Sequence, residues 1–109
     1  MLDEQIDVLG VKKLQDGNAD FLLLDCRNPE ERELVSIEDS VFIPMGELPQ
    51  RVAELEEHRE KHVVVYCHHG GRSDMVCNWL RAQGFLRVQN MQGGIDAWAC
   101  HVATELPRY

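Results

Sequence analysis

The sequence predicts an α/β domain with a central, mostly parallel sheet of five strands and helices on both of its faces. Short apolar runs rich in β-branched residues predict the strands, and the clearest is residues 63–66, Val-Val-Val-Tyr. Runs of this kind suit strands buried on both faces, which are typical of parallel sheets. Segments with apolar residues at helical spacing separate them. At 109 residues the chain suits one compact domain, residues 1–109, without a linker.

In chain order, residues 5–8 are expected to form a short edge strand, and residues 9–17 a helix that ends at a glycine. Residues 21–26 predict a second buried strand. Cys26 within it should be a small core side chain, because free cysteine is among the most buried residue types. Asn28 is then an N-cap, followed by proline at the first helical position and a capping-box glutamate at the third, which predicts a short helix.

The end of the second strand is flanked by Asp25 and Arg27. A structural ion pair or loop anchor is the expected role for both, and a direct catalytic role is the alternative. Residues 41–44 predict a short third strand that proline ends, because proline cannot donate to the ladder. Residues 47–62 predict a helix with a solvated face of glutamates. For that face, a docking surface for a basic partner is the alternative.

After a strand at residues 63–67, a mostly buried helix is expected to open at Ser73 and to stop at Gly84, which can supply the left-handed turn after the last helical residue. Cys77 lies among the apolar residues of this helix. It should therefore be a core side chain rather than a resolving thiol.

The last elements are a strand and a short helix. Residues 86–91 alternate apolar and polar side chains, which predicts a less buried strand. Gly93 and Gly94 are expected to form a plain turn. Residues 95–100 should then be helical, with Cys100 as a passive thiol.

Residues 67–73, Cys-His-His-Gly-Gly-Arg-Ser, connect a strand to a helix, which is where ligands bind in open α/β sheets. Gly70 and Gly71 let the backbone turn with its N–H groups inward, and Arg72 adds a permanent cation. An ordinary thiol has a pKa of about 8.5, whereas cysteines at helix N-termini or beside cations fall to roughly 3.5–7.5. The segment therefore predicts a reactive thiolate, Cys67, in an anion-binding loop.

The same seven residues fit the Cys-x-x-Gly-x-Arg-Ser loop of single-domain rhodaneses, and the chain resembles that sulfurtransferase family along nearly its whole length. Residues 23–27, 28–31 and 93–98 also match its motifs. The resemblance implies a rhodanese-like fold and a Cys67 persulfide that moves a sulfane sulfur from a small anionic donor such as thiosulfate to a thiophilic acceptor. Cyanide, a small thiol and a sulfur-accepting protein are the candidate acceptors. No cofactor is implied besides the covalent intermediate.

The resemblance also assigns roles around the sulfur. The expected persulfide cradle comprises His68, His69, Gly70, Gly71, Arg72 and Ser73. Arg72 would orient the loop or steady the donor, and Ser73 would cap the next helix or hydrogen-bond the sulfur. His68 and His69 are either exposed loop side chains or donor-binding groups. A metal site is not expected, because adjacent histidines rarely converge on one ion and no further ligands cluster.

Two other functions stay open. A phosphatase or arsenate reductase would use the same thiolate and arginine on a tetrahedral oxyanion, but its loop is one residue longer than the six from Cys67 to Arg72. A non-catalytic rhodanese-like binding module is the other alternative, although such modules lack the cysteine. One departure from the family lies at residues 35–40, where a family histidine is missing and acids are added. It leaves the local loop contacts and the choice of partner open.

Charge and composition exclude further classes. The chain has 11 basic and 19 acidic side chains and a net charge of −8, the wrong sign for general binding to nucleic acid or anionic membranes. An anionic donor would therefore depend on local positive potential around His68, His69 and Arg72. No apolar run approaches the roughly 18 residues of a membrane span, and the four cysteines form no Cys-x-x-Cys pair. A reducing cytoplasm is the expected location.

Overall fold

The structure, a computed structural model, describes residues 2–109. Its centre is a five-stranded sheet in the order β1-β5-β4-β2-β3, in which every pairing is parallel. The strands are β1 (Gln5–Ile6), β2 (Phe21–Asp25), β3 (Val41–Phe42), β4 (His62–Tyr66) and β5 (Arg87–Met91). The predicted sheet is confirmed, and it contains no antiparallel pair among the described residues.

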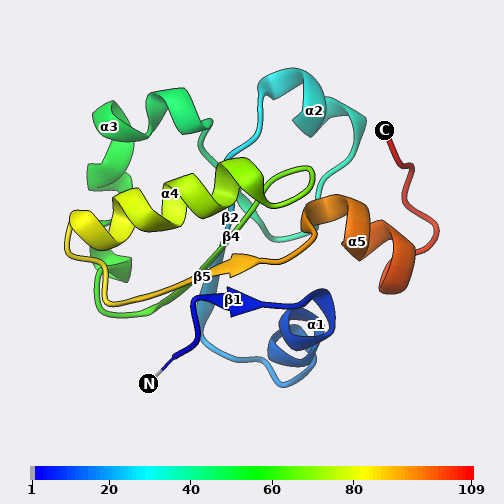
Figure 1. Ribbon diagram of the computed structural model, residues 1–109, viewed down its shortest axis with the longest axis horizontal. Helices are drawn as coiled ribbons and strands as arrows, with labels where there is room; N and C mark the ends of the chain where they lie inside the picture. The colour runs from blue at the N-terminus through cyan, green and yellow to red at the C-terminus, as the bar shows by residue number, and fades with distance from the viewer. Residues whose placement is uncertain (1) are drawn as a thin grey trace.

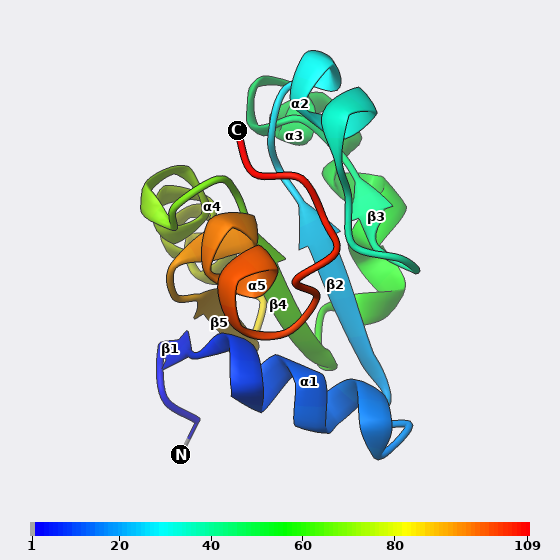
Figure 2. The same ribbon diagram turned by 90° about the vertical axis from the view of Figure 1, so that its right-hand side faces the viewer.

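Helices cover both faces of the sheet, as predicted (Figure 1). α1 (Val8–Asp16) and α5 (Gly94–His101) pack on one face, and α4 (Gly71–Ala82) packs on the other together with α3 (Leu48–Arg51). α2 (Pro29–Leu34) follows the end of β2 and stands apart from both layers. The chain after α5 runs back toward α2, so the C-terminal segment lies beside the start of that helix (Figure 2).

The strand β4 divides its side chains between the two core layers. Val63 and Val65 belong to the layer under α4, and Cys67, the next residue in this alternation, belongs to it too. Val64 and Tyr66 belong to the layer under α1 and α5. This follows from the two-residue period of a strand, because successive side chains point to opposite faces. All five side chains are buried, which confirms the strand buried on both faces.

The prediction of one continuous helix over residues 47–62 is wrong. The segment consists of a 3₁₀ turn η1 (Met45–Glu47), the short helix α3, and a 3₁₀ helix η2 (Val52–His58). In a 3₁₀ helix, side chains three residues apart eclipse one another. Arg51 and Glu54, three apart, form an ion pair with Nε to Oε2 at 2.8 Å, which suits that period. His62 belongs to β4 rather than to this helix, and its Nε2 lies 2.7 Å from Gln89 Oε1.

Two further expectations need correction. α4 begins at Gly71 rather than Ser73, because Gly70 caps it with a φ of +112° that glycine adopts readily. The helix is amphipathic rather than mostly buried, since the side of α4 that carries Met75 faces solvent, with Met75 62% exposed. Cys77 is buried, as predicted, and Gly84 has a φ of +98° just after the helix.

β5 is far more buried than its alternating sequence predicted. It lies between β1 and β4, so both of its edges are paired. Gln89 and Asn90 are buried although they are polar, because each is hydrogen-bonded; the Gln89 amide donates to Asp3 O at 2.9 Å. None of the helices in residues 2–109 combines the length and the apolar character that a bilayer crossing requires.

Candidate active site

The candidate nucleophile, Cys67, directly follows the carboxyl end of β4, and the loop after it leads into the N-terminus of α4. The residue is only 1% exposed. Gly70 N–H donates to its Sγ at 3.1 Å, and Ser73 N–H donates to the same atom at 3.4 Å. The left-handed backbone of Gly70 turns these amides toward the sulfur. The loop therefore surrounds Cys67 with inward N–H groups, as the glycines in its sequence predicted.

These donors decide the ionisation of Cys67. Burial by itself would raise the pKa of the thiol, but hydrogen bonds from the Ser73 hydroxyl and from loop amides outweigh it and lower the pKa below its ordinary value. The two other buried cysteines have no such donors. Burial raises the pKa of Cys26 far above its ordinary range, and it raises the pKa of Cys77 to about 12. Among the three buried thiols, only Cys67 has a lowered pKa.

Ser73 connects the sulfur to the neighbouring strand. Its hydroxyl lies 3.4 Å from Cys67 Sγ and 3.2 Å from Gly70 O, and it makes a short contact with Asn90 Oδ1. A hydroxyl has one proton, so these three acceptors compete for it. The Asn90 amide in turn donates to Gly70 O at 3.2 Å, and β5 thereby braces the loop. Asn90 was not predicted as part of the site; the available signal was a polar residue near the end of a predicted strand.

Arg72 points from the first turn of α4 to α2, where it meets Glu31. Its two terminal nitrogens donate to the two Glu31 oxygens at 2.6 and 2.9 Å. The Glu31 carboxylate also accepts from Asn28 N–H at 3.0 Å and from the Tyr109 hydroxyl at 2.6 Å. The hydrogen bonds from Arg72 have the largest effect on the pKa of Glu31 and lower it, together with the other donors, to about 2. Burial alone would raise this pKa, but its effect is smaller. The capping-box role predicted for Glu31 is present, but its pairing with Arg72 was not foreseen.

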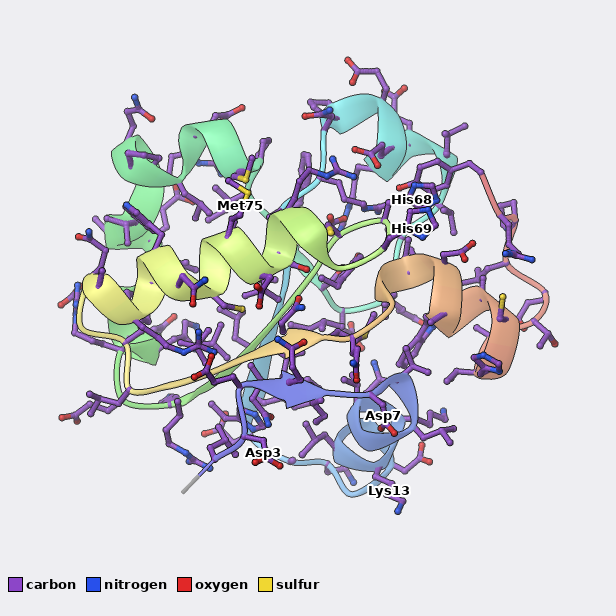
Figure 3. All side chains as sticks on the ribbon, in the orientation of Figure 1. Asp3, Asp7, Lys13, His68, His69 and Met75 are labelled. Atoms are coloured by element: carbon purple, nitrogen blue, oxygen red, sulfur yellow. The ribbon has the colours of Figure 1, made fainter. Side chains whose placement is uncertain are left out.

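His68 and His69 stack on each other and on the C-terminal segment. The ring of His68 lies between those of His69 and Tyr109, with centroids 3.9 Å away on each side. Figure 3 shows the two histidines side by side between α2 and α5. The His69 side chain is 68% exposed, and its Nδ1 lies 3.9 Å from Asp96 Oδ2. His68 Nε2 is buried without a hydrogen-bond partner among residues 2–109.

The turn at Gly93 and Gly94 also supports the loop. Both residues have positive φ values, +84° and +62°. The N–H groups that open α5 donate to the loop carbonyls, from Ile95 to Cys67 O at 2.9 Å and from Asp96 to His68 O at 3.1 Å. A Cβ at position 94 would lie 2.5 Å from Cys67 O, so the close approach requires glycine. This turn is therefore a part of the site, whereas the sequence predicted only a plain turn.

The predicted ion pair of Asp25 and Arg27 is confirmed. Both side chains are fully buried, and Arg27 donates through Nε and Nη2 to the two Asp25 oxygens at 2.9 and 2.8 Å. Burial would raise the pKa of Asp25, but its bonds to Arg27 lower it. The pair anchors the end of β2, because Arg27 also donates to Val35 O at 2.7 Å. The atypical segment 35–40 packs here, with Ile37 N–H donating to the Tyr66 hydroxyl at 3.2 Å.

No group of three or more His, Cys, Asp or Glu side chains within residues 2–109 is arranged to hold a metal ion. The four cysteines are free thiols; Cys26 and Cys77 are core side chains, as predicted, and Cys100 is partly exposed. The arrangement thus brings together one activated thiol, a ring of amide donors and a paired arginine. Such a site suits covalent chemistry at sulfur.

Comparisons with known proteins identify the family of the chain. The rhodanese-like domain family matches residues 10–101. A protein of Allochromatium vinosum named "Sulfurtransferase" is 39% identical over 97 residues, which cover 89% of both chains. A rhodanese-related protein from Thermoplasma volcanium superposes with a TM-score of 0.78 at 30% identity, covering 96% of both chains. The tRNA uridine(34) hydroxylase of Citrobacter koseri is 34% identical over 86 residues, but the match spans only 25% of that protein. The chain therefore belongs to the rhodanese-like domain family.

Proposed function

We propose that the protein is a sulfurtransferase that moves a sulfane sulfur from a donor to a thiophilic acceptor through a Cys67 persulfide. The observation that supports this most strongly is the cradle of N–H groups around a cysteine whose pKa is lowered. A thiolate held in this way is both a nucleophile and a site where one further sulfur atom can carry a negative charge.

The proposed reaction has two displacements. The Cys67 thiolate attacks the sulfane sulfur of the donor, the donor's own bond to that sulfur breaks, and the rest of the donor leaves with the electron pair. With thiosulfate the leaving group is sulfite. An acceptor such as cyanide or a thiolate then attacks the outer sulfur of the persulfide, and Cys67 leaves as a thiolate. The covalent persulfide carries the sulfur, so the reaction needs no cofactor.

The loop residues have distinct roles in this proposal. The amides of residues 68–73 hold the persulfide anion, and Ser73 adds a hydroxyl to the cradle. Arg72 orients the loop through its ion pair with Glu31. Both terminal nitrogens of Arg72 contact Glu31, so a phosphatase, which needs that arginine on a tetrahedral oxyanion, gains no support from the geometry. The lowered pKa of Cys67 likewise gives no support to a non-catalytic module.

Intact-protein mass after incubation with a sulfur donor tests the proposal. Wild type should gain one sulfur atom from thiosulfate or from cysteine persulfide, and addition of cyanide should remove it as thiocyanate. Cys67→Ser should gain none at that position by peptide mapping. Cys100→Ser, which removes the partly exposed thiol, should behave as wild type. An unchanged wild-type mass with both donors would contradict the proposed function.

A further inference from the structure

The charge around the sulfur cradle is balanced rather than positive. Arg72 is the permanent cation of the loop, and its guanidinium binds both oxygens of Glu31. The side chains are 32% and 16% exposed respectively, so solvent screens the pair only in part. A bidentate pair of this kind leaves little of the arginine's charge for a bound anion.

Several contacts keep Glu31 in this position. Its Oε1 accepts from the backbone of Asn28, and its Oε2 accepts from Tyr109, whose ring stacks on His68 with an angle of 9° between the planes. With a pKa of about 2, the carboxylate is ionised throughout the neutral range. The negative charge beside Arg72 is thus a fixed feature of the site.

Within residues 2–109, the exposed cations beside the loop are paired with acids as well. Arg108 donates through Nε and Nη2 to the two Asp96 oxygens at 2.9 and 3.2 Å, so these charges also cancel. Nδ1 of His69, the exposed histidine of the loop, lies 3.9 Å from Asp96 Oδ2. The chain as a whole carries −8. Arg27 and Arg32, the two cations at the end of β2, both bind the single carboxylate of Asp25. Among the described residues, a small dianion at the loop therefore meets no exposed cation that lacks an acidic partner.

We propose that Glu31 is a specificity-determining residue, and that it directs the cradle toward organic persulfide donors, R–S–S–H, in preference to the thiosulfate dianion. This inference rests on the proposed function. Cys67–S⁻ attacks the outer sulfur of the donor, the donor S–S bond breaks, R–S⁻ leaves, and Cys67–S–S–H forms. The reacting groups carry one negative charge when the donor is protonated, and two when it reacts as R–S–S⁻ and Cys67–S–S⁻ forms. With thiosulfate they carry three, because sulfite leaves as a dianion and the persulfide forms as an anion.

The loop amides can accommodate the single charge, since Gly70 and Ser73 both donate to the sulfur. The additional negative charge of thiosulfate would need a cation that is not already paired. Arg72 becomes such a cation only when the charge of Glu31 is removed. The donor class is therefore controlled by one carboxylate that does not touch the sulfur.

The test measures the rates at which Cys67 gains sulfur from thiosulfate and from cysteine persulfide, by rapid quenching and intact mass. Glu31→Gln removes the charge but keeps an oxygen for the Asn28 N–H. Glu54→Gln is the matched control, because Glu54 pairs with Arg51 through two bonds, at 2.8 and 3.2 Å, and the change in net charge is the same.

Wild type should be loaded faster by cysteine persulfide. In Glu31→Gln, loading by thiosulfate should rise about tenfold while loading by the persulfide stays within about twofold, since a local potential acts chiefly on the more highly charged donor. Glu54→Gln should keep the wild-type ratio. An unchanged ratio in Glu31→Gln, an equal change in Glu54→Gln, or a wild-type preference for thiosulfate would overturn the inference while leaving the sulfurtransferase intact. Loading by neither donor would overturn the proposed function itself.

Discussion

The hydroxyl of Ser73 provides a direct test of what ionises Cys67. Ser73→Ala deletes a single donor and leaves the backbone amides of Gly70 and Ser73 in place. The hydroxyl is 3.4 Å from the sulfur, and it is also within reach of Gly70 O and Asn90 Oδ1. If its proton serves the sulfur, the substitution should raise the pKa of Cys67 toward its ordinary value.

The size of the effect follows from the bond that is lost. A hydrogen bond to a charged group contributes about 1.5–3 kcal/mol, and the long distance here places this one at the lower end. About 1.4 kcal/mol changes the ratio of thiolate to thiol tenfold. Below the pKa of the thiol, the rate of alkylation at Cys67 should therefore fall roughly tenfold in Ser73→Ala. The cavity left by one buried hydroxyl should cost little in addition.

The assay is the pH dependence of iodoacetamide alkylation, followed by mass. Both proteins carry Cys100→Ser, which removes the partly exposed thiol. Cys26 and Cys77 are as buried as Cys67, but their pKa values are raised, so they should not react. Circular dichroism establishes that the variant is folded. A change of less than twofold at every pH would refute the reasoning, because it would show that the hydroxyl donates to Asn90 Oδ1 or Gly70 O rather than to the sulfur, and that the amides alone hold the thiolate.

Three further predictions concern stability, each measured by urea unfolding. Gly94→Ala should destabilise the fold by about 2–4 kcal/mol, because the new methyl group meets loop carbonyl oxygens and the positive φ is strained; Gly71→Ala, whose Cβ meets nothing within 4 Å, is the control. Arg27→Met should cost at least about 3 kcal/mol, since it leaves the buried carboxylate of Asp25 without its main partner. The stability advantage of wild type over Glu31→Gln should be constant above the ordinary glutamate pKa and should disappear as pH falls toward 2, because the folded-state pKa is lowered.

Most of the fold could be predicted from local patterns in the sequence. β4 was predictable because three valines and a tyrosine leave no alternation, and the loop was predictable because residues adjacent in the chain build it. The form of residues 47–62 was mispredicted for a physical reason. The spacing of four from Leu48 to Val52 fits an α-helix, but the spacing of three from Val52 to Leu55 fits an α-helix and a 3₁₀ helix alike.

The missing parts of the site come from distant segments. Tyr109 is 41 residues beyond His68, and Glu31 is 41 residues before Arg72. No periodicity in the sequence links such pairs, because their contact depends on how the last segment and α2 are placed by the whole sheet (Figure 2). β5 was misjudged in the same way, since its burial follows from its central place in the strand order.

Side chains alternate along β4, so the face on which Cys67 lies depends on whether an even or an odd number of residues precedes it in the strand. Val63, Val65 and Cys67 face one layer, whereas Val64 and Tyr66 face the other, where the Tyr66 hydroxyl donates to Asp25 at 3.1 Å. Deleting or inserting one valine would exchange the two sets. A thiol would then stand where the phenol now stabilises a buried carboxylate, and an aromatic ring would fill the space of the sulfur. The strand can therefore accept substitutions, or insertions and deletions of two residues, without moving Cys67 to the other face of the sheet.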